Sequence, residues 1–388
     1  MSVGAITVST GEDGIVLLTI DDPTQRVNTM NENFVSSLDE VLATIAAQDV
    51  TGVIITSAKK TFFAGGDLND LLEADPAQID EFTAFVARNR DLLRRLETLP
   101  VPVVAAINGS ALGGGLELAL ATHHRIVVDD PRLRLGLPEV TLGLLPGAGG
   151  VVRTVRLLGV QKALSELLLT GRSLTAAAAR ELGIVDHLVV SVDELIPAAR
   201  EWIAANPSPR QPWDRADYVL PGGTPADRSG ALNPVLPMLP ARLRADLKGA
   251  DYPAPQNILK AAVEGAQVDV DNALQIETRY FIDLALGQVA KNMIKANFFD
   301  RATVTGLRGR DADRTPWTAK KALVLGAGMM GAGIAYQCAR AGIEVILKDV
   351  SQETAEHGKA YSARVLDKQV SAGRITETER DAVLHRIV

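Results

Sequence analysis

Apolar residues alternate with polar ones near the N-terminus and then gather into short runs. Residues 5–10 alternate, residues 14–20 are almost all apolar, and a turn-forming GEDG sequence joins them. This pattern predicts two strands connected by a tight turn. Another apolar run at 50–57 predicts the next strand. Between them, the sequence predicts a helix over 32–48 that Asn31 caps at its N-terminus.

Later segments repeat apolar residues at helical spacing. Residues 77–97 carry a stripe that predicts an amphipathic helix packed in the core or in an interface: Phe82, Phe85, Leu92, Leu93 and Leu96. Residues 206–256 hold 10 of the 19 prolines, which predicts a long irregular excursion. Helical spacing returns over 257–299. Residues 300–319 are polar and predict a linker, with Arg308, Arg310, Asp311, Asp313 and Arg314.

Two lone acids lie in apolar segments. A predicted strand at 101–107 leads through three glycines into a helix that starts near Gly114 and carries Glu117. A buried carboxylate is costly unless it has a partner or a function. Glu117 is therefore either a first-turn acid that the helix dipole favours or a functional group. Glu139, in the Gly- and Pro-rich segment 135–150, is the second such acid and favours function.

Length and composition set limits on the class of protein. A chain of 388 residues with 47% hydrophobic and 22% charged residues predicts a soluble protein of two or three domains. The net charge of −7 argues against nucleic acid or an anionic membrane as general partners. The single cysteine, Cys338, excludes an internal disulfide framework and is typical of a reducing compartment. Without a signal-peptide pattern or a long apolar run, a cytoplasmic location is expected.

Four phrases resemble the enoyl-CoA hydratase, or crotonase, family. They occur in the family's order: TFFAGGDLNDL at 61–71, SALGGGLELAL at 110–120, GLPEVTLGLLPGAGG at 136–150 and LTAAAARELGIVDHLV at 174–189. The resemblance covers roughly residues 5–205. It implies an α/β fold with a crotonase-fold hydratase domain over residues 1–205.

The resemblance also implies a reaction and its residues. Glu117 and Glu139 would hold one water for syn addition to a 2-trans-enoyl-CoA, a coenzyme A thioester, giving a 3-hydroxyacyl-CoA in fatty-acid β-oxidation. Backbone N–H groups of Gly66 and Gly114 would form the oxyanion hole. No metal is needed for this chemistry, and His123 and His124, which lack other ligands at metal-binding spacing, are interpreted as packing or surface residues.

In the resembling family, the loop that corresponds to residues 26–30 lines the coenzyme A channel. Three cations in or near this predicted channel remain open to two interpretations. Arg26, Lys59 and Lys60 are either phosphate contacts or solvated surface residues. Two other functions also remain open: a Δ3,Δ2-enoyl-CoA isomerase, which can work with one glutamate, and a non-catalytic acyl-CoA-binding or thiolase-scaffolding module. The presence of both glutamates favours hydration.

A dinucleotide-binding pattern follows near the end of the sequence. An apolar strand leads into LVLGAGMMGAGIA, where Gly326, Gly328 and Gly331 have the GxGxxG spacing and open a helix. Met330 lies in the same turn, and a second predicted strand ends at Asp349. In this context the pattern predicts pyrophosphate at the helix N-terminus and a ribose contact to Asp349. The alternative is a glycine-rich turn without a nucleotide.

The remaining segments resemble multifunctional fatty-acid oxidation proteins of the α-subunit type. The phrase over residues 273–300 is similar to their helical connector, and residues 320–388 are similar to the start of the Rossmann NAD-binding domain of 3-hydroxyacyl-CoA dehydrogenases. The resemblance implies that the full-length protein oxidises the hydratase product with NAD and binds a thiolase β subunit. Only 68 residues remain from Lys321, so we expect a truncated or degraded form without complete dehydrogenase activity. NAD is expected to bind only if the Rossmann part is complete, because half of a parallel sheet would expose an edge and an apolar face.

Overall fold

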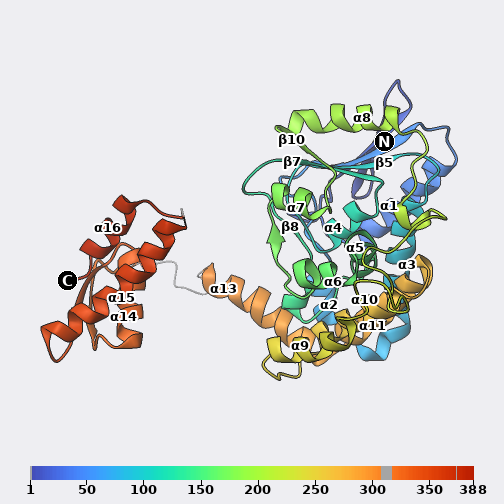
Figure 1. Cartoon of the computed structure of the whole chain (residues 1–388). Helices are drawn as coiled ribbons and strands as arrows, with labels where there is room; N and C mark the ends of the chain where they lie inside the picture. Colours follow the sequence, from blue (N-terminus) through green and yellow to red (C-terminus); the bar gives the residue numbers. More distant parts are fainter. Residues whose placement is uncertain (1, 307–316, 373) are drawn as a thin grey trace. The chain divides into compact units, whose positions relative to one another are not determined.

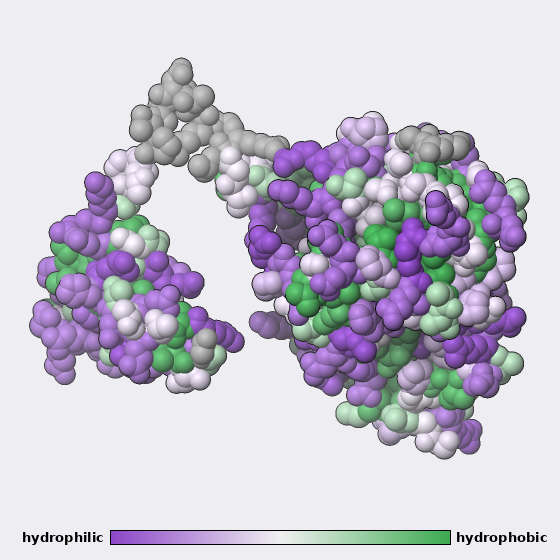
Figure 2. Space-filling model, turned by 90° about the horizontal axis from the view of Figure 1, so that it is seen from above, coloured by the Kyte–Doolittle hydropathy of each residue, from purple (hydrophilic) through white to green (hydrophobic). Residues whose placement is uncertain are grey.

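The computed structural model describes residues 2–306, 317–372 and 374–388. It divides into two compact units, unit 1 (Met1–Gly306) and unit 2 (Leu307–Val388) (Figure 1). In both units, polar residues surround smaller apolar patches on the face seen in Figure 2. In the described part of the chain, no helix combines the length and the apolar character needed to span a bilayer.

The main sheet of unit 1 is built from the apolar runs. Its described strands, in spatial order, are β1 (Ser2–Val3), β2 (Ile6–Thr10), β3 (Ile15–Ile20), β4 (Gly52–Ser57), β5 (Val103–Ile107), β7 (His124–Val128) and β10 (His187–Val189). The pairs β1–β2 and β2–β3 are antiparallel, and those from β3 to β10 are parallel. Every residue of β5 is buried, as expected for a central parallel strand.

Helices cover both faces of this sheet. α8 (Leu195–Ala205) packs on β4, β5 and β7 from one side, whereas α1 (Glu32–Ala46) and α4 (Gly114–Leu120) lie on the other (Figure 1). The predicted cap of α1 is confirmed, because the Asn31 side chain accepts a hydrogen bond from the Phe34 N–H.

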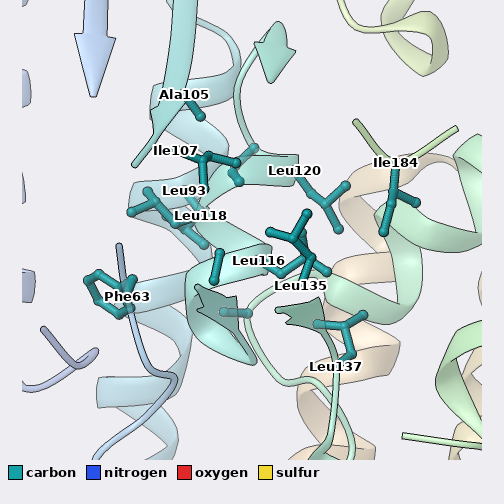
Figure 3. Packing of buried hydrophobic residues seen from close by; sticks show 14 of the residues in the cluster. Phe63, Leu93, Ala105, Ile107, Leu116, Leu118, Leu120, Leu135, Leu137 and Ile184 are labelled. Atoms are coloured by element: carbon teal, nitrogen blue, oxygen red, sulfur yellow. The ribbon is translucent and has the colours of Figure 1, made fainter. Parts of the chain in front are cut away.

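The leucines of α4 are part of the central core. Leu116, Leu118 and Leu120 are buried among side chains from β5, from α3 (Ile79–Glu97) and from the region of β8 (Leu135–Gly136) (Figure 3). Because its side chains are packed on several sides, α4 is a rigid support for Glu117.

Shorter elements complete the hydratase-like part of unit 1. They are the small sheet of β6 (Ala111–Leu112), β8 and β9 (Ser173–Leu174), the helices α2 (Leu68–Glu73), α5 (Gly150–Leu158), α6 (Val160–Ala163) and α7 (Ala176–Leu182), the 3-10 helices η1 (Pro76–Gln78), η2 (Glu139–Leu142) and η4 (Val192–Glu194), and the π-helix η3 (Leu164–Leu168). The sequence patterns did not predict the small sheet, because two-residue strands have no detectable period.

The predicted irregular excursion over 206–256 is partly helical. It contains the 3-10 helices η5 (Pro212–Asp214) and η6 (Leu236–Met238) and the helix α9 (Leu239–Asp246), and α10 (Pro253–Gly265) begins within it. The sequence interpretation treated the prolines as breakers. Pro240, Pro253 and Pro255 instead occupy first turns, where a missing N–H costs no hydrogen bond.

The connector is helical, as predicted. Here the name connector denotes residues 253–305, which form α10, α11 (Val270–Ala285), α12 (Gln288–Ile294), the π-helix η7 (Lys295–Asp300) and α13 (Arg301–Thr305). The linker predicted over 300–319 therefore begins as a helix, because α13 continues directly from η7. Its residues 307–316, with Arg308, Arg310, Asp311, Asp313 and Arg314, lie outside the described residues.

Unit 2 contains two parallel strands, β11 (Lys321–Leu325) and β12 (Glu344–Lys348), and the helices α14 (Met329–Arg340), α15 (Gln352–Ser371) and α16 (Glu377–His385). Ile387 forms a bridge to Val345 beside β12. The helices bury Val324, Val345 and Leu347, while Leu323, Leu325 and Ile346 on the same strands are exposed.

Candidate active site

Glu117 lies in the first turn of α4 and is 3% exposed. Its Oε1 accepts hydrogen bonds from the backbone N–H groups of Ala148 and Gly150, both at 2.8 Å. Burial raises the pKa of Glu117 to about 7, although the two N–H groups and the positive charge of Arg153 act in the opposite direction. The carboxyl group is therefore fixed in place and close to the midpoint of its titration at neutral pH.

Glu139 opens η2, the 3-10 helix that follows Pro138. Its Oε2 is buried and has no hydrogen-bond partner among the described residues. Burial and the negative charge of Glu117 raise the pKa of Glu139 well above its ordinary value. Burial therefore favours the protonated form of Glu139, next to the second carboxyl group of Glu117.

The two glycines predicted for the oxyanion hole lie close to these acids. Gly114 is the first residue of α4, and its nitrogen lies 3.9 Å from the position that a β-carbon on Gly65 would occupy. Gly65 has a φ of +95° and turns the chain into Gly66, where a β-carbon would meet no atom within 4 Å. The backbone at Gly66 is thus open to an approaching ligand.

One cavity brings these four residues together. It has a volume of about 1150 Å³ and is lined by Gly66, Gly114, Glu117 and Glu139. Its wall is largely apolar, and four aromatic side chains line it: Phe82, Phe85, Phe281 and Phe298. Phe82 and Phe85 were expected to pack in the core or in an interface. They are half-buried because the cavity takes up the space beside them.

The connector forms part of the same cavity, which the sequence did not predict. Phe281 from α11 stacks on Phe82 with ring centroids 6.4 Å apart. Asn297 and Phe298 from η7 also line the cavity, and the Asn297 amide donates a hydrogen bond to the Thr141 carbonyl at 3.0 Å. The hydroxyl of Tyr252 donates to the carbonyl of Val140. Residues after 250 thus hold the segment that carries Glu139.

Another acid close to this site, Glu277, lies on α11 and is 1% exposed. It accepts the N–H groups of Gly149 and Val152, next to those that Glu117 accepts. The sequence contained a signal for it, since Glu277 interrupts the apolar stripe that includes Leu274 and Phe281. The stripe was interpreted only as connector packing.

The cations near the predicted coenzyme A channel differ in their surroundings. Lys59 donates from Nζ to the carbonyls of Asp22 and Gln25, at 2.5 and 2.6 Å, and so anchors the loop after β3. Arg26 and Lys60 are exposed. Lys59 therefore has a structural function, and Arg26 and Lys60 are free to approach a phosphate.

The histidine pair packs, as predicted. His123 Nδ1 accepts the Val103 N–H at 3.0 Å, and His124 stacks on Trp202 with ring centroids 4.5 Å apart.

Unit 2 has the geometry of a dinucleotide-binding turn. Gly326 has a φ of +94°, and a β-carbon on Gly331 would lie 1.7 Å from the Gly326 carbonyl oxygen. A β-carbon on Gly328 would meet no atom within 4 Å, and Met330 is exposed. Asp349 accepts the N–H groups of Ala327 and Val350, which keeps it beside the turn and holds its pKa below the ordinary value. These residues fit a pyrophosphate at the N-terminus of α14.

Comparisons with known proteins show which families the sequence matches. The sequence matches the family described as enoyl-CoA hydratase/isomerase over residues 10–209, and that described as 3-hydroxyacyl-CoA dehydrogenase, NAD binding domain, over residues 321–388. It is 35% identical over 384 residues to the fatty acid oxidation complex subunit alpha of Shewanella loihica. The match covers 98% of this chain and 53% of that protein, so the chain spans about half the length of this curated relative.

Two solved structures show the fold. An enoyl-CoA hydratase from Bacillus halodurans has a TM-score of 0.55 and 22% identity, with 76% of this chain and 100% of that chain covered. An enoyl-CoA hydratase/isomerase from Mycobacterium paratuberculosis has a TM-score of 0.51 and 21% identity, with 75% and 98% covered. The predicted α/β class, a crotonase-fold domain followed by helices and the start of a Rossmann domain, is confirmed. Since residues 10–209 are more than half of the chain, it belongs to the enoyl-CoA hydratase/isomerase family.

Proposed function

We propose that this chain adds water to 2-trans-enoyl-CoA thioesters and releases 3-hydroxyacyl-CoA. The observation that carries the proposal is the pair of carboxyl groups, Glu117 and Glu139, which line one apolar cavity and whose pKa values are both raised by burial. An addition across a double bond needs one group that accepts a proton and one that donates a proton. The family membership supports the same reaction.

In the proposed reaction both acids hold one water. Glu117 takes a proton from the water as the water oxygen bonds to C3 of the substrate, and Glu139 gives its proton to C2. The thioester oxygen gains negative charge as the C3–O bond forms, and the N–H groups of Gly66 and Gly114 stabilise that charge. Proton transfer within the pair then restores the starting state, so the reaction adds one H₂O.

In the full-length protein, with the Rossmann part complete, we propose that NAD binds through Gly326, Gly328, Met330, Gly331 and Asp349. When bound, it would supply the oxidation of the 3-hydroxyl group. The side chain of Asp349 accepts from the ribose hydroxyls and repels a 2′-phosphate, so NAD is preferred over NADP. Residues 1–205 are proposed as the hydratase part and residues 320–388 as the dinucleotide-binding part. For the full-length protein we propose a role in fatty-acid β-oxidation, a thiolase β subunit as partner and a cytoplasmic location.

The hydratase proposal is tested by the loss of enoyl-thioester absorbance with crotonyl-CoA and a longer 2-enoyl-CoA. Glu117→Gln and Glu139→Gln should each lower the rate by about a hundredfold or more, the scale of a positioned acid or base. Faster turnover of a 3-enoyl-CoA than of the 2-enoyl-CoA would indicate an isomerase instead. An intact, folded parent chain that binds coenzyme A without turnover would contradict both activities.

A further inference from the structure

Two carboxylates divide the N–H groups of one short loop. Ala148 and Gly150 donate to Glu117, at 2.8 Å each, while Gly149 and Val152 donate to Glu277, at 2.5 and 2.9 Å. The loop continues into α5, whose first N–H groups have no partner within the helix. Glu277 therefore accepts the N–H groups of the N-cap residue Gly149 and of Val152 in the first turn of α5, from a helix that begins 120 residues after the start of α5, at Val270.

Close packing leaves this loop little freedom. A β-carbon on Gly147 would lie 2.5 Å from the ring of Phe281, and one on Gly149 would lie 3.0 Å from Leu274 Cδ2. Both neighbours belong to α11, as Glu277 does. On the opposite side, a β-carbon on Gly150 would lie 2.8 Å from Glu117 Oε1. The loop is thus held between α11 and the carboxylate of Glu117, and a displacement on one side is transmitted to the other.

Charged groups surround Glu277 on several elements. Glu117 faces it from α4, Glu139 from η2 and Arg153 from α5. Arg153 is paired with Glu97 of α3 through two hydrogen bonds of 3.0 Å, and Arg94 of α3 joins Glu97, Asp214 and Asp271. Glu97 offsets part of the charge of Arg153, so Glu117 and Glu277, whose pKa values Arg153 lowers, share this cation with Glu97.

These charges affect one another's titration. Burial and the charge of Glu117 raise the pKa of Glu277 to about 8. In turn, the charge of Glu277 adds to that of Glu117 in raising the pKa of Glu139. Glu277 lies outside the residues that line the cavity in the described part of the chain, whereas Gly147 and Ala148 line it. Glu277 therefore acts on the site through the loop and through its charge, without touching a substrate.

We propose that Glu277 is a positioning residue for the hydration reaction: by accepting the Gly149 and Val152 N–H groups it fixes the loop whose neighbouring N–H groups orient Glu117. This inference rests on the hydratase function proposed above. If Glu277 has this role, the connector contributes to the function of the hydratase site, although the connector lies beyond the residues that match the hydratase family.

The test compares Glu277→Gln with the parent chain in crotonyl-CoA hydration from pH 5 to pH 10. Glutamine keeps the shape but has one acceptor oxygen, so either Gly149 or Val152 loses its partner. We expect kcat to fall by about ten- to hundredfold, the scale of a small misplacement of a catalytic group, with KM unchanged. The high-pH limb should move down by about one pH unit, because the pKa of Glu139 falls when a neighbouring negative charge is removed.

Glu264→Gln is the matched control. Glu264 lies on α10 of the connector, where it pairs with Arg279 and Tyr280 away from the cavity, and its replacement should leave kcat, KM and the pH profile unchanged. Glu277→Ala removes both acceptors and should lower kcat further. If it does not fold, as judged by circular dichroism, Glu277→Gln still decides the matter.

The outcomes separate the two proposals. An inactive, folded parent chain overturns the hydratase function. An active parent with an unchanged rate and pH profile in Glu277→Gln overturns only the positioning role. A lower melting temperature with full kcat and an unmoved high-pH limb would also overturn it, because it would assign Glu277 to stability alone.

Discussion

Gly113 lies against the carboxylate of Glu139, because a β-carbon at residue 113 would come within 2.7 Å of Glu139 Oε1. Gly113 also has a φ of +55°, a conformation that side chains disfavour. We predict that Gly113→Ala displaces Glu139 and lowers the crotonyl-CoA hydration rate by about a hundredfold, as expected for a misplaced acid. Steady-state kinetics of the purified variant would measure this loss.

The control for this variant is Gly333→Ala. Gly333 lies in α14 of unit 2, and a β-carbon there would meet no atom within 4 Å. It should hydrate crotonyl-CoA at the parent rate. Full activity in Gly113→Ala would show that Glu139 tolerates displacement, and the proposed role of Glu139 would then be wrong.

The pH dependence of hydration should follow the two acids. Burial raises the pKa of Glu117 to about 7 and, together with the charge of Glu117, raises the pKa of Glu139 well above its ordinary value. If Glu117 works ionised and Glu139 works protonated, kcat/KM rises as the pH increases through about 7 and falls at higher pH. The limbs belong to the coupled pair. A rate that is constant from pH 5 to pH 10 would contradict this assignment.

The same raised pKa predicts a cost in stability. Glu139 keeps its proton in the folded chain at pH values where the unfolded chain has lost it, so unfolding releases a proton and stability falls as the pH rises above about 4.5. Glu139→Gln does not titrate. Its advantage over the parent should grow by up to about 1.4 kcal/mol per pH unit above that value. Urea unfolding of both chains at pH 5 and pH 8 measures the difference in their free energies of unfolding. An equal difference at the two pH values would refute the prediction.

The buried ion pair of Arg153 and Glu97 supports the loop before α5, because Arg153 also donates a hydrogen bond to the Ala148 carbonyl. Both side chains are fully buried. Arg153→Met should lower the free energy of unfolding by about 3–5 kcal/mol, since it leaves a buried charge without its main partner. Adding Glu97→Leu should restore much of that loss. Denaturant unfolding of the single and double variants would measure this recovery in the free energy of unfolding. If the two substitutions instead lowered the free energy of unfolding additively, the two residues would not act as a pair.

Local signals in the sequence predicted the centre of the site. The apolar run before Gly113 indicates a buried strand, and the three glycines indicate that a ligand can approach the backbone closely. The isolated Glu117 indicates a charge that is costly to bury. None of these signals depends on distant residues. The structure confirms β5, α4 and the burial of Glu117. The catalytic assignments of Glu117, Glu139, Gly66 and Gly114 stay predictions, as do those of the dinucleotide-binding residues.

Distant contacts explain what the sequence did not predict. Glu277 is separated from Gly149 by 128 positions, so no local pattern could pair them. The half-buried Phe82 fits a core stripe as well as a cavity wall, because helical spacing specifies the face of a helix and not what lies opposite. The prolines after residue 206 were interpreted as helix breakers whatever their position, and three of them lie in the first turns of two helices, α9 and α10.

The N–H groups of the loop before α5 are accepted by Glu117 of α4 and by Glu277 of α11. This limits where the chain can be cut into smaller functional pieces. An excised piece that stopped at residue 209, where the hydratase family match ends, would retain Glu117 and Glu139 but lose the acceptor for two donors and one aromatic wall of the cavity. We therefore expect the smallest piece with the proposed hydratase activity to extend through the connector, and insertions within the connector to lower that activity.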